Sequence, residues 1–419
     1  MIDYILPKKI LNDPVHGFIN VLAGNLFDVI EYPYFQRLRR IKQLGLTYFV
    51  YPGALHTRFH HALGATHLMS EAIKVLQQKN EDISDEEAIS AQYAILLHDI
   101  GHGPFSHALE HTIIKDLSHE ILSSYLMNEF NTIYGGKLDD AIRIFNDDYP
   151  KGFLHQLVSS NMDVDRLDYL KRDSFFTGVS EGVIGSERII KMLRVVDGNI
   201  VIEAKGLHSV ENFMISRELM YWQVYLHKTV IAAEQMLVNV LMRAKELAIR
   251  GENLYASPAF KFFLYENIGR EDLLTFVSFE GKKRKVLDIF TLLDDYDIMS
   301  SLKVWCFHSD KILSDLSLRL VNRRLFKIYL RKIPFEKEFN NNIAKKIMSE
   351  IKVAEEDVHY YFVNNKIETG RQNQDSEVMI YFNQKEVLPL SQVSEILSKN
   401  FFLNDVVKYY VCYPKEIDR

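Results

Sequence analysis

Apolar residues recur at intervals of three and four positions from about Pro33 to Arg250, with short polar or glycine-containing turns between the runs. This spacing is that of amphipathic helices, so the segment is expected to fold as a helical domain. One helix start is marked by Ser84 and Glu87, which form a capping-box pattern ahead of the apolar run 88–97. That run is apolar on most sides, which predicts a buried helix with a histidine and an aspartate at its end.

The pattern changes in two places. Residues 195–204 place Asp197-Gly198-Asn199 between apolar pairs, which predicts a small hairpin between helices. Beyond about Gly251, shorter helical patterns give way to alternating or β-branched runs, which predict an α+β region. The strands expected there are 359–363, 378–382 and 406–413.

Together these patterns predict a mainly α protein in two parts. Residues 1–255 comprise an N-terminal segment and a helical core. Residues 256–419 form the smaller α+β region, for which we expect a role in oligomerisation or regulation. A chain of 419 residues is long enough for two or three domains, and its 47% hydrophobic and 25% charged residues are typical of a folded globular protein.

Charge and cysteine content narrow the class of protein. The net charge of −6 gives no global electrostatic reason to bind nucleic acid or an acidic membrane. The two cysteines, Cys306 and Cys412, suggest neither a disulfide framework nor a thiolate zinc site. No apolar run reaches the ~18 residues needed to span a bilayer. A soluble cytoplasmic protein is therefore expected.

The most informative stretch is HDIGHGPFSH, residues 98–107, which begins where the buried helix is expected to end. Burying the adjacent imidazole and carboxylate of His98 and Asp99 without a partner would be costly. A divalent metal ion would satisfy both groups, because imidazole and carboxylate together suit first-row transition metals or magnesium. A hydrogen-bonded structural pair is the alternative, and the dipeptide alone does not decide between them.

Two further segments complete a ligand set. In HTRFHHALGATH, residues 56–67, Arg58 and His61 are three positions apart and would share one helix face. In NMDVDRLDY, residues 161–169, three carboxylates fall within six positions, and a solvated acidic face would explain them in isolation. Taken together, two histidines and two aspartates form the mixed nitrogen and oxygen set of a hydrolytic metal site. The predicted ligands are His61, His98, Asp99 and Asp165.

The order of these four ligands resembles that of the HD-domain metal-dependent phosphohydrolases. The stretches NDPVHG (12–17), FQRLRRIKQLG (35–45) and YPGALHTRFHHALG (51–64) are also similar to the deoxynucleoside triphosphate triphosphohydrolase branch, which includes the sterile-alpha-motif-and-HD-domain enzymes and their bacterial relatives. The similarity is clear from about residue 8 to 230. It implies a helical HD core that holds one divalent ion (manganese, iron, magnesium, nickel or zinc). It also implies hydrolysis of a dNTP, with dGTP favoured, to deoxynucleoside and inorganic triphosphate.

The resemblance also implies roles for residues around the metal. His102, His107 and His119 would protonate the leaving oxygen or contact the α-phosphate, since imidazole exchanges protons near neutral pH. Glu110 stands where relatives have aspartate. Arginines would neutralise the polyphosphate, and the other groups would recognise the deoxyribose and line its pocket; surface ion pairs and ordinary core packing are the alternatives. The implied substrate-binding residues are Arg58, Gln43, Leu44, Arg166, Tyr169, Asp173, Arg217 and Tyr225.

Relatives of this kind are often controlled by nucleotides bound between subunits, which implies an activating nucleotide and a homodimer or homotetramer. Glu31 stands where the animal enzymes have aspartate for the activator base, so guanine-specific activation does not follow. A solvated helix face is the alternative for the basic residues of RRLFK, 323–327. The positions that match the regulatory site are Asn12, Glu31, Gln36, Arg39, Arg323 and Lys327.

Two other functions remain open. One is an HD phosphodiesterase or nuclease that acts on another nucleotide or on single-stranded nucleic acid. The negative net charge disfavours a polymer, but Arg58, Arg166 and Arg217 could form a local groove for one. The other is a nucleotide-sensing protein without catalysis. Loss of catalysis normally removes a metal ligand, and all four ligand types are present.

Overall fold

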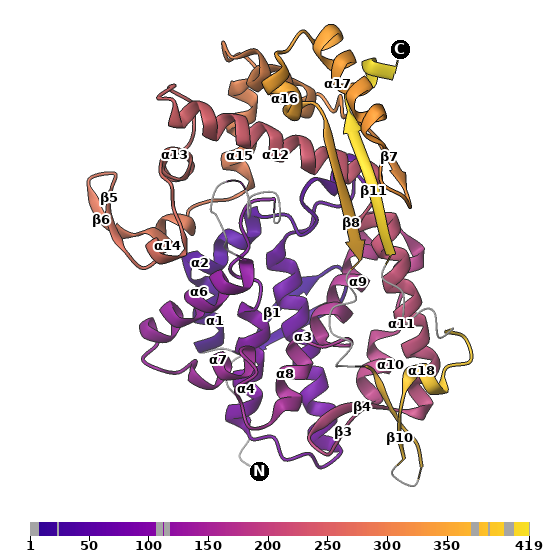
Figure 1. Cartoon of the computed structure of the whole chain (residues 1–419). Coiled ribbons are helices and arrows are strands. Elements are labelled where there is room, and N and C mark those ends of the chain that lie inside the picture. Colours follow the sequence, from indigo (N-terminus) through magenta and orange to yellow (C-terminus); the bar gives the residue numbers. More distant parts are fainter. Residues whose placement is uncertain are drawn as a thin grey trace.

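The computed structural model of the chain describes residues 8–22, 25–105, 112, 118–369, 377–383, 386–397 and 406–418. The helices of the first half form one body, and the helices from α12 (Lys228–Ile249) to α17 (Lys337–Ile351) gather with a small sheet toward the C-terminus (Figure 1). This arrangement confirms the prediction of a mainly α fold with a smaller α+β C-terminal region. The division at residue 255 stays a prediction.

The long helix α3 lies against both α4 and α9. The predicted capping box begins α4: the Ser84 hydroxyl accepts the Glu87 N–H at 3.2 Å, and the Glu87 carboxylate accepts the Ser84 N–H at 2.9 Å. The last turn of α4, residues 94–97, is fully buried, as its apolar sequence predicts. The helices of this part are α1 (Asn25–Glu31), α2 (Pro33–Gln36), α3 (Arg58–Gln78), α4 (Asp85–Leu97), α6 (His119–Ile133), α7 (Asp139–Phe145), α8 (Gly152–Val158), α9 (Val164–Thr177), α10 (Ser186–Lys191) and α11 (Leu207–Met220).

The C-terminal helices pack on α12, whose neighbours include α13 and α16. Short helical turns connect many of the elements, and one of them, η5, is a π-helical turn. The remaining α-helices are α13 (Pro258–Tyr265), α14 (Val286–Phe290), α15 (Asp295–Trp305), α16 (Lys311–Val321) and α18 (Leu390–Val393). The short turns are η1 (Arg37–Arg40), η2 (Gly45–Phe49), η3 (Ser180–Gly182), η4 (Ala204–Gly206), η5 (Tyr221–Tyr225), η6 (Arg270–Asp272), η7 (Glu355–Tyr360) and η8 (Lys415–Asp418).

The strands in the described part of the chain form four small sheets. Two are antiparallel hairpins, β1–β2 and β5–β6, and a third is antiparallel in the order β7-β11-β8. The fourth, in the order β10-β9-β4-β3, joins the two parts of the chain, because β4 pairs in parallel with β9. The strands are β1 (Lys8–Asp13), β2 (Gly17–Leu22), β3 (Leu193–Val196), β4 (Asn199–Glu203), β5 (Phe276–Phe279), β6 (Lys282–Lys285), β7 (Lys327–Arg331), β8 (Val363–Thr369), β9 (Met379–Tyr381), β10 (Val387–Pro389) and β11 (Val406–Tyr413).

The predicted hairpin at 195–204 is confirmed as β3–β4, and its turn residues Asp197 and Gly198 both have positive φ. The predicted strands 378–382 and 406–413 correspond to β9 and β11. The predicted strand 359–363 is wrong. Most of it is the end of η7 and the residues after it, and the strand β8 begins only at Val363. The first turn of η7 contains three acidic residues, which favour the start of a helix. The strand prediction considered only the apolar residues that follow them.

None of the helices in the described part of the chain combines the length and the apolar character that crossing a bilayer requires. Cys306 and Cys412 are both free thiols. Cys412 lies in β11 and is fully buried.

Candidate metal centre and its surroundings

The four predicted ligands come from helices that pack against one another. His61 lies in the first turns of α3, His98 and Asp99 follow α4, and Asp165 lies in the first turn of α9. Because α3 contacts both α4 and α9, the four side chains meet where these helices join. His61 is fully buried and Asp99 nearly so.

Glycines allow the elements that carry the ligands to approach closely. A Cβ atom at Gly64 would lie 2.0 Å from Asp168 Oδ1 and 2.2 Å from Arg172 Nη2, so α3 can lie this close to α9 only without a side chain there. At Gly101 a Cβ atom would lie 2.2 Å from the backbone oxygen of His119. The spacing of the ligands is therefore set by two positions that tolerate no side chain.

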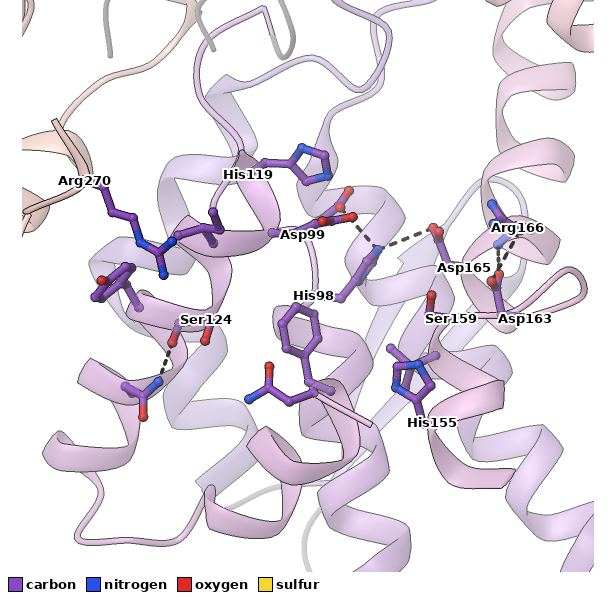
Figure 2. Close-up of a pocket in the computed structure, with 17 residues that line it drawn as sticks. His98, Asp99, His119, Ser124, His155, Ser159, Asp163, Asp165, Arg166 and Arg270 are labelled. Carbon is purple, nitrogen blue, oxygen red and sulfur yellow. Dashed lines mark hydrogen bonds and ion pairs between the residues drawn. The ribbon is translucent and has the colours of Figure 1, made fainter. Parts of the chain in front are cut away.

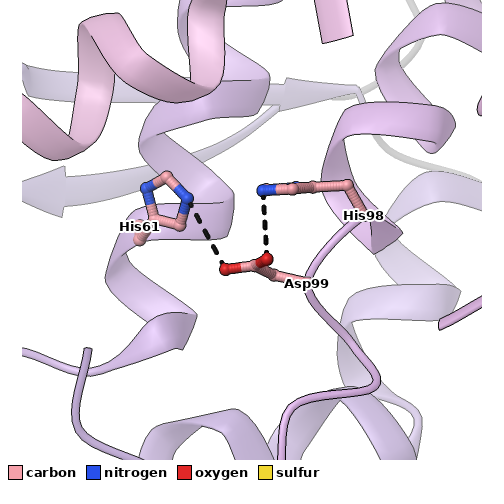
Figure 3. A group of neighbouring side chains, drawn as sticks. All are labelled: His61, His98 and Asp99. Atoms are coloured by element: carbon pink, nitrogen blue, oxygen red, sulfur yellow. Dashed lines mark ion pairs between the residues drawn. The ribbon is translucent and has the colours of Figure 1, made fainter. Parts of the chain in front are cut away.

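Both histidine ligands direct Nε2 toward carboxylates. Asp165 Oδ1 lies 2.9 Å from His61 Nε2 and 3.4 Å from His98 Nε2. The two oxygens of Asp99 face the same pair, with Oδ1 3.4 Å from His98 Nε2 and Oδ2 3.9 Å from His61 Nε2 (Figure 3). Among the described residues, neither Nε2 atom has a hydrogen-bond partner, although both are buried. Two buried nitrogen atoms without hydrogen bonds, surrounded by carboxylates, are the arrangement that a bound cation explains.

The other ring nitrogens define the tautomers. His98 Nδ1 donates to the Ile95 carbonyl at 2.7 Å, because a carbonyl oxygen can only accept. His61 Nδ1 lies 2.8 Å from Asp168 Oδ2 and donates to it. In the neutral ring each Nε2 therefore carries a lone pair, and a hydrogen bond from Nδ1 to an acceptor is the usual companion of a metal-bound imidazole. The described residues fit a divalent ion.

The charges around these rings favour a cation. Burial alone would lower the pKa of His61, but the Asp165 and Asp168 carboxylates raise it to about 10. Burial alone would raise the pKa of Asp99, but His102, His98 and the Arg58 guanidinium hold it well below its usual range. The carboxylates are therefore ionised at neutral pH, and a divalent ion would take the place that a proton on His61 otherwise fills.

A second group of side chains continues from Asp99. The ligand atoms of Asp99, His102 and His119 all lie within 4.8 Å of one another, as do those of His61, His98 and Asp99. The rings of His102 and His119 are 3.8 Å apart between centroids. The structure therefore brings these two predicted proton-transfer residues together beside the metal ligands. The other two, His107 and Glu110, lie outside the described residues.

Asp168 anchors a buried network behind His61. It accepts from His16 Nε2 at 2.7 Å, from His61 Nδ1 at 2.8 Å and from both Nε and Nη2 of Arg172 at 2.9 Å. Arg172 Nη1 also donates to Asp13 at 2.7 Å, and the Asp13 carboxylate accepts the backbone N–H of His16 at 2.9 Å. The NDPVHG motif thus reaches the metal centre through side chains. Sequence reasoning did not assign these residues; the three-residue spacing of Asp165 and Asp168 was the signal available for one of them.

Replacing Asp168 with asparagine is expected to lower metal affinity about 10- to 100-fold, as loss of such a supporting carboxylate does elsewhere. The amide can still accept one hydrogen bond, but it removes the charge that holds His61 and pairs with Arg172. Metal affinity is measured by competition with a calibrated chelator. The matched control is Asp140→Asn, an exposed acid on α7. Equal affinities in the two variants would contradict this role.

The loop that follows α4 and begins with His98 and Asp99, called the HD loop below, is held from two sides. The guanidinium of Arg37, fully buried, donates from Nη2 to the Ile100 carbonyl at 3.0 Å and to the His102 carbonyl. Asp295, at the start of α15, accepts the Phe105 N–H at 2.9 Å through one oxygen and the Lys42 N–H at 2.9 Å through the other. The C-terminal part of the chain therefore positions both the HD loop and the backbone next to the predicted pocket residues 43 and 44.

Among the predicted phosphate-binding arginines, Arg58 and Arg166 adjoin the ligands. Arg58 is buried and donates to Asp99. Arg166 donates from Nε to the Ser160 carbonyl at 2.7 Å and lies 3.4 Å from Asp163, the N-cap of α9. Arg217 lies farther along α11, with its guanidinium over the Tyr221 ring at 5.8 Å.

The predicted deoxyribose residues form a connected group. The Tyr169 ring lies 6.5 Å from the His61 ring and 6.0 Å from the Tyr225 ring. Tyr225 donates its hydroxyl proton to Asp173 at 2.8 Å, and His56 Nε2 donates to the other Asp173 oxygen at 2.7 Å. The amide oxygen of Gln43 is buried and accepts no hydrogen bond from the described residues, and Leu44 is half-buried against the core.

Among the described residues, Gln36 and Arg39 are the only predicted regulatory residues that share a hydrogen bond or ion pair with each other. Arg39 donates to Gln36 at 2.8 Å, and its guanidinium lies 3.6 Å from the centroid of the Phe59 ring. Arg323 donates to the Phe49 carbonyl at 2.7 Å, and Lys327 pairs with Asp418 at 2.6 Å. Asn12 and Glu31 are exposed, on β1 and at the end of α1.

A cavity of about 640 Å³ opens beside the metal ligands and extends toward α6, α7 and α8. Figure 2 shows His98 and Asp99 in its wall, with Arg166 on one side and Arg270 on the other. Sequence reasoning missed most of this lining, because α6 to α8 carry no recognisable motif. The missed polar lining residues include Glu120, Ser124, Asn128, Asn146, His155, Ser159 and Arg270.

Comparison with known proteins agrees with this geometry. Residues 58–173 match the model of the HD domain, and residues 184–257 match that of the HD associated region. An uncharacterized protein from Bacillus subtilis, YwfO, is 35% identical over 85% of this chain and 79% of its own length. The deoxynucleoside triphosphate triphosphohydrolase SAMHD1 homolog from Dictyostelium discoideum is 34% identical over 57% of this chain, which spans 50% of that protein.

A solved structure extends the likeness to the whole chain. The crystal structure of a phosphohydrolase from Bacteroides thetaiotaomicron is 49% identical and superposes with a TM-score of 0.92, covering 97% of this chain and 99% of that one. The sequence similarity, the fold and the ligand geometry lead to the same assignment. The chain belongs to the HD-domain phosphohydrolase family.

Proposed function

We propose that this HD-domain phosphohydrolase hydrolyses deoxynucleoside triphosphates, with dGTP preferred, to deoxynucleoside and inorganic triphosphate. The observation that supports this most is the position of the predicted sugar residues directly beside the metal ligands, where the Tyr169 ring lies 6.5 Å from the His61 ring. The similarity to the Dictyostelium triphosphohydrolase supports the same substrate class. That similarity covers half of the relative, so the substrate is inferred from the site.

The phosphate end of the substrate would lie against His61, His98, Asp99 and Asp165. A divalent ion held by these side chains supplies polarisation of a phosphoryl oxygen and a lower pKa for water. Arg58, which donates to Asp99, would neutralise phosphate charge without leaving its carboxylate, since a guanidinium has several donors. His102 and His119 would hold and deliver the proton that the departing 5′ oxygen requires.

The sugar end would lie against Tyr169 and Tyr225. Asp173 accepts from both Tyr225 and His56, so its carboxylate has a fixed orientation. A carboxylate held in this way can accept a hydrogen bond from the 3′-hydroxyl, and a tyrosine ring packed against the sugar leaves little room for a 2′-hydroxyl. These two features would select deoxyribose over ribose.

The test is direct. The full chain is stripped with chelator, reloaded with manganese, and incubated with each of the four dNTPs and the four rNTPs, with inorganic triphosphate and nucleoside quantified by ion-exchange chromatography. Equimolar deoxynucleoside and triphosphate from dNTPs, fastest with dGTP, is the expected result. The assay is repeated with a second nucleotide present, which detects activity that requires an activating nucleotide. Absence of triphosphate under all of these conditions would exclude the proposed activity.

We further propose that the chain works as a homodimer or homotetramer with an activating nucleotide at the subunit interface. The supporting observation is that, apart from Gln36 and Arg39, the matching residues share no hydrogen bond or ion pair within the described part of one chain, as expected of a site that is completed by another subunit. A cytoplasmic location fits both a dNTP substrate and two free thiols. Light scattering with and without nucleotide measures the oligomeric state.

A further inference from the structure

The chain leaves the C-terminal sheet after β8 and returns to it at the same point. Thr369, the last residue of β8, pairs with Val406, the first residue of β11. The residues between these two strands include β9, β10 and α18, and this segment lies against β4 and α11. Ile380 of β9 and Leu390 of α18 are fully buried. Figure 1 shows β10 and α18 beneath β8 and β11 and close to α11.

One end of α11 is joined to this segment through a buried carboxylate. Glu211, which is 1% exposed, accepts the Ser394 hydroxyl at 2.6 Å, and its other oxygen lies 2.8 Å from His208 Nδ1. The Ser394 hydroxyl accepts the Leu397 N–H at 2.9 Å, which fixes its direction. Burial alone would raise the pKa of this carboxyl group, but hydrogen bonds from Ser394, from His208 and from the Ile396 backbone lower it. A buried charge that loses a partner is costly, so this contact ties α11 to the C-terminal segment.

The other end of the same helix is joined to β11. α11 continues directly into the π-helical turn η5, in which Trp222 donates to Glu218 at 2.7 Å. Lys408, near the start of β11, places Nζ 3.3 Å from the centroid of the Trp222 ring. An ammonium group over an indole ring is attractive, and more so when both are partly shielded from water, as these half-buried side chains are. The C-terminal chain therefore contacts the helix at both ends.

Predicted substrate groups lie on the part of the helix that these two contacts enclose or adjoin. Arg217 is on α11, between Glu211 and Trp222. Tyr225 ends η5 and donates to Asp173 at 2.8 Å. A π-helical turn interrupts the regular helix, and such turns are frequent at functional sites. α9 and α10 also contact α11, so the C-terminal chain adjusts the position of a helix that the HD core already holds.

We propose that the C-terminal segment is a clamp that positions α11 and η5 for substrate binding. The clamp consists of residues 377–397 and Lys408, and it acts through Glu211 and Trp222, which are positioning residues. Within the described residues, the clamp shares no hydrogen bond or ion pair with the four metal ligands. It therefore governs how firmly the substrate is held and leaves the chemical step to the metal centre.

Arg217 and Tyr225 are the phosphate and sugar contacts of the proposed function, on which this proposal rests. A helix that is released at either end would move these two side chains relative to the metal ligands. The expected effect is weaker binding of substrate in the ground state and the transition state alike, which raises KM and leaves kcat unchanged.

Ser394→Ala removes the hydroxyl that binds Glu211 and leaves the rest of the clamp in place. With the full chain loaded with manganese, the KM for dGTP is expected to rise about fivefold while kcat stays within about twofold. Ser394→Thr keeps a hydroxyl and is expected to return KM to the wild-type value. The matched control Ser349→Ala removes an exposed hydroxyl from α17 and should change neither constant.

Trp222 provides a readout that does not depend on catalysis. The chain has two tryptophans, and Trp305 is 1% exposed, so quenching of the fluorescence by acrylamide reports mainly on Trp222. Glu211, which Ser394 holds, is about 16 Å from Trp222 along the helix axis. Ser394→Ala is expected to raise the quenching constant about twofold across this separation, which a purely local role would not do.

Lys408→Met is the second variant, because it removes the cation from the opposite end of the helix and keeps an apolar side chain of similar length. It is expected to raise the KM for dGTP to a similar degree, again with kcat unchanged. Its matched control is Lys345→Met, an exposed lysine on α17. Circular dichroism identifies any variant that does not fold, and the remaining variant then decides the result.

The outcomes separate the clamp from the proposed function. Unchanged KM and unchanged quenching in the clamp variants overturn the clamp and leave triphosphate release standing. A fall in kcat with unchanged KM also overturns it, because the effect would then lie at the metal centre. If the wild-type chain releases no triphosphate, the proposed function fails, and the quenching of Trp222 in Ser394→Ala still decides whether the clamp holds the helix.

Discussion

Replacing Asp165 with alanine is expected to remove bound metal and to lower phosphohydrolase activity by about 10³-fold or more. Asp165 Oδ1 faces both His61 Nε2 and His98 Nε2, so its loss removes the one oxygen shared by the two histidine ligands. The remaining ligands come from α3 and the end of α4 only, and α9 no longer contributes to the centre. Metal content after dialysis and the rate of substrate hydrolysis are the two measurements.

The control for this substitution is Asp140→Ala, which removes an exposed carboxylate from α7 and leaves the centre intact. Asp165 lies in the first turn of α9, and its side chain is 23% exposed, so circular dichroism should show a folded variant. An unchanged metal-to-protein ratio in Asp165→Ala would show that this residue is not a ligand.

Replacing Gly64 with alanine is expected to destabilise the fold by about 3 kcal/mol or more. The added Cβ would lie 2.0 Å from Asp168 Oδ1 and 2.2 Å from Arg172 Nη2, far inside contact distance. Either α3 and α9 move apart or the buried ion pair between Asp168 and Arg172 breaks, and both responses are costly. The midpoint of thermal unfolding should fall by roughly 10 °C in this size of domain.

Gly152→Ala is the matched control for this prediction. Gly152 begins α8, and a Cβ atom there meets nothing within 4 Å. This substitution should leave the unfolding temperature unchanged or slightly raised, because alanine restricts the unfolded chain. Equal unfolding temperatures for the two variants would show that α3 and α9 do not approach as closely as described. Metal affinity of the folded fraction of Gly64→Ala should also fall, since Asp168 holds His61.

Structure that depends on residues close together in the sequence could be predicted. Ser84 and Glu87 form the capping box at α4, because both partners lie within one turn. The Asp197-Gly198 turn forms between β3 and β4, because its residues tolerate positive φ. The ligand motifs could be recognised from residue types and spacing, and the structure brings the four ligands together. Their role as ligands stays a prediction until metal is measured.

Features that depend on tertiary contacts could not be predicted. His16 and Asp168 are separated by 152 positions, and nothing in the spacing of either motif says that they share a hydrogen bond. Asp295 contacts the HD loop from α15, far along the chain and in a segment without a motif. The lining of the cavity could not be predicted either. Asn128 and Asn146 belong to no motif, and they become lining residues only when the helices pack together.

The strand predicted at 359–363 failed for a different reason. A run of aromatic and β-branched residues over five positions fits a short strand, but a 3₁₀ helix followed by a turn can bury the same residues. Val358, Tyr360 and Tyr361 are buried in the structure from this non-strand conformation. Short apolar runs therefore locate the core more reliably than they identify the element.

The parallel pairing of β4 with β9 affects how the chain reaches its native state. Ile202 pairs with Ile380, which is fully buried, so a contact of very high sequence separation completes this sheet. During synthesis the β3–β4 hairpin emerges from the ribosome long before its partner exists, and β4 is left as an exposed edge. A chain shortened from the C-terminal end would keep this edge permanently. We therefore expect truncated forms to aggregate or to require chaperones, and expression of the HD region alone to give little soluble protein.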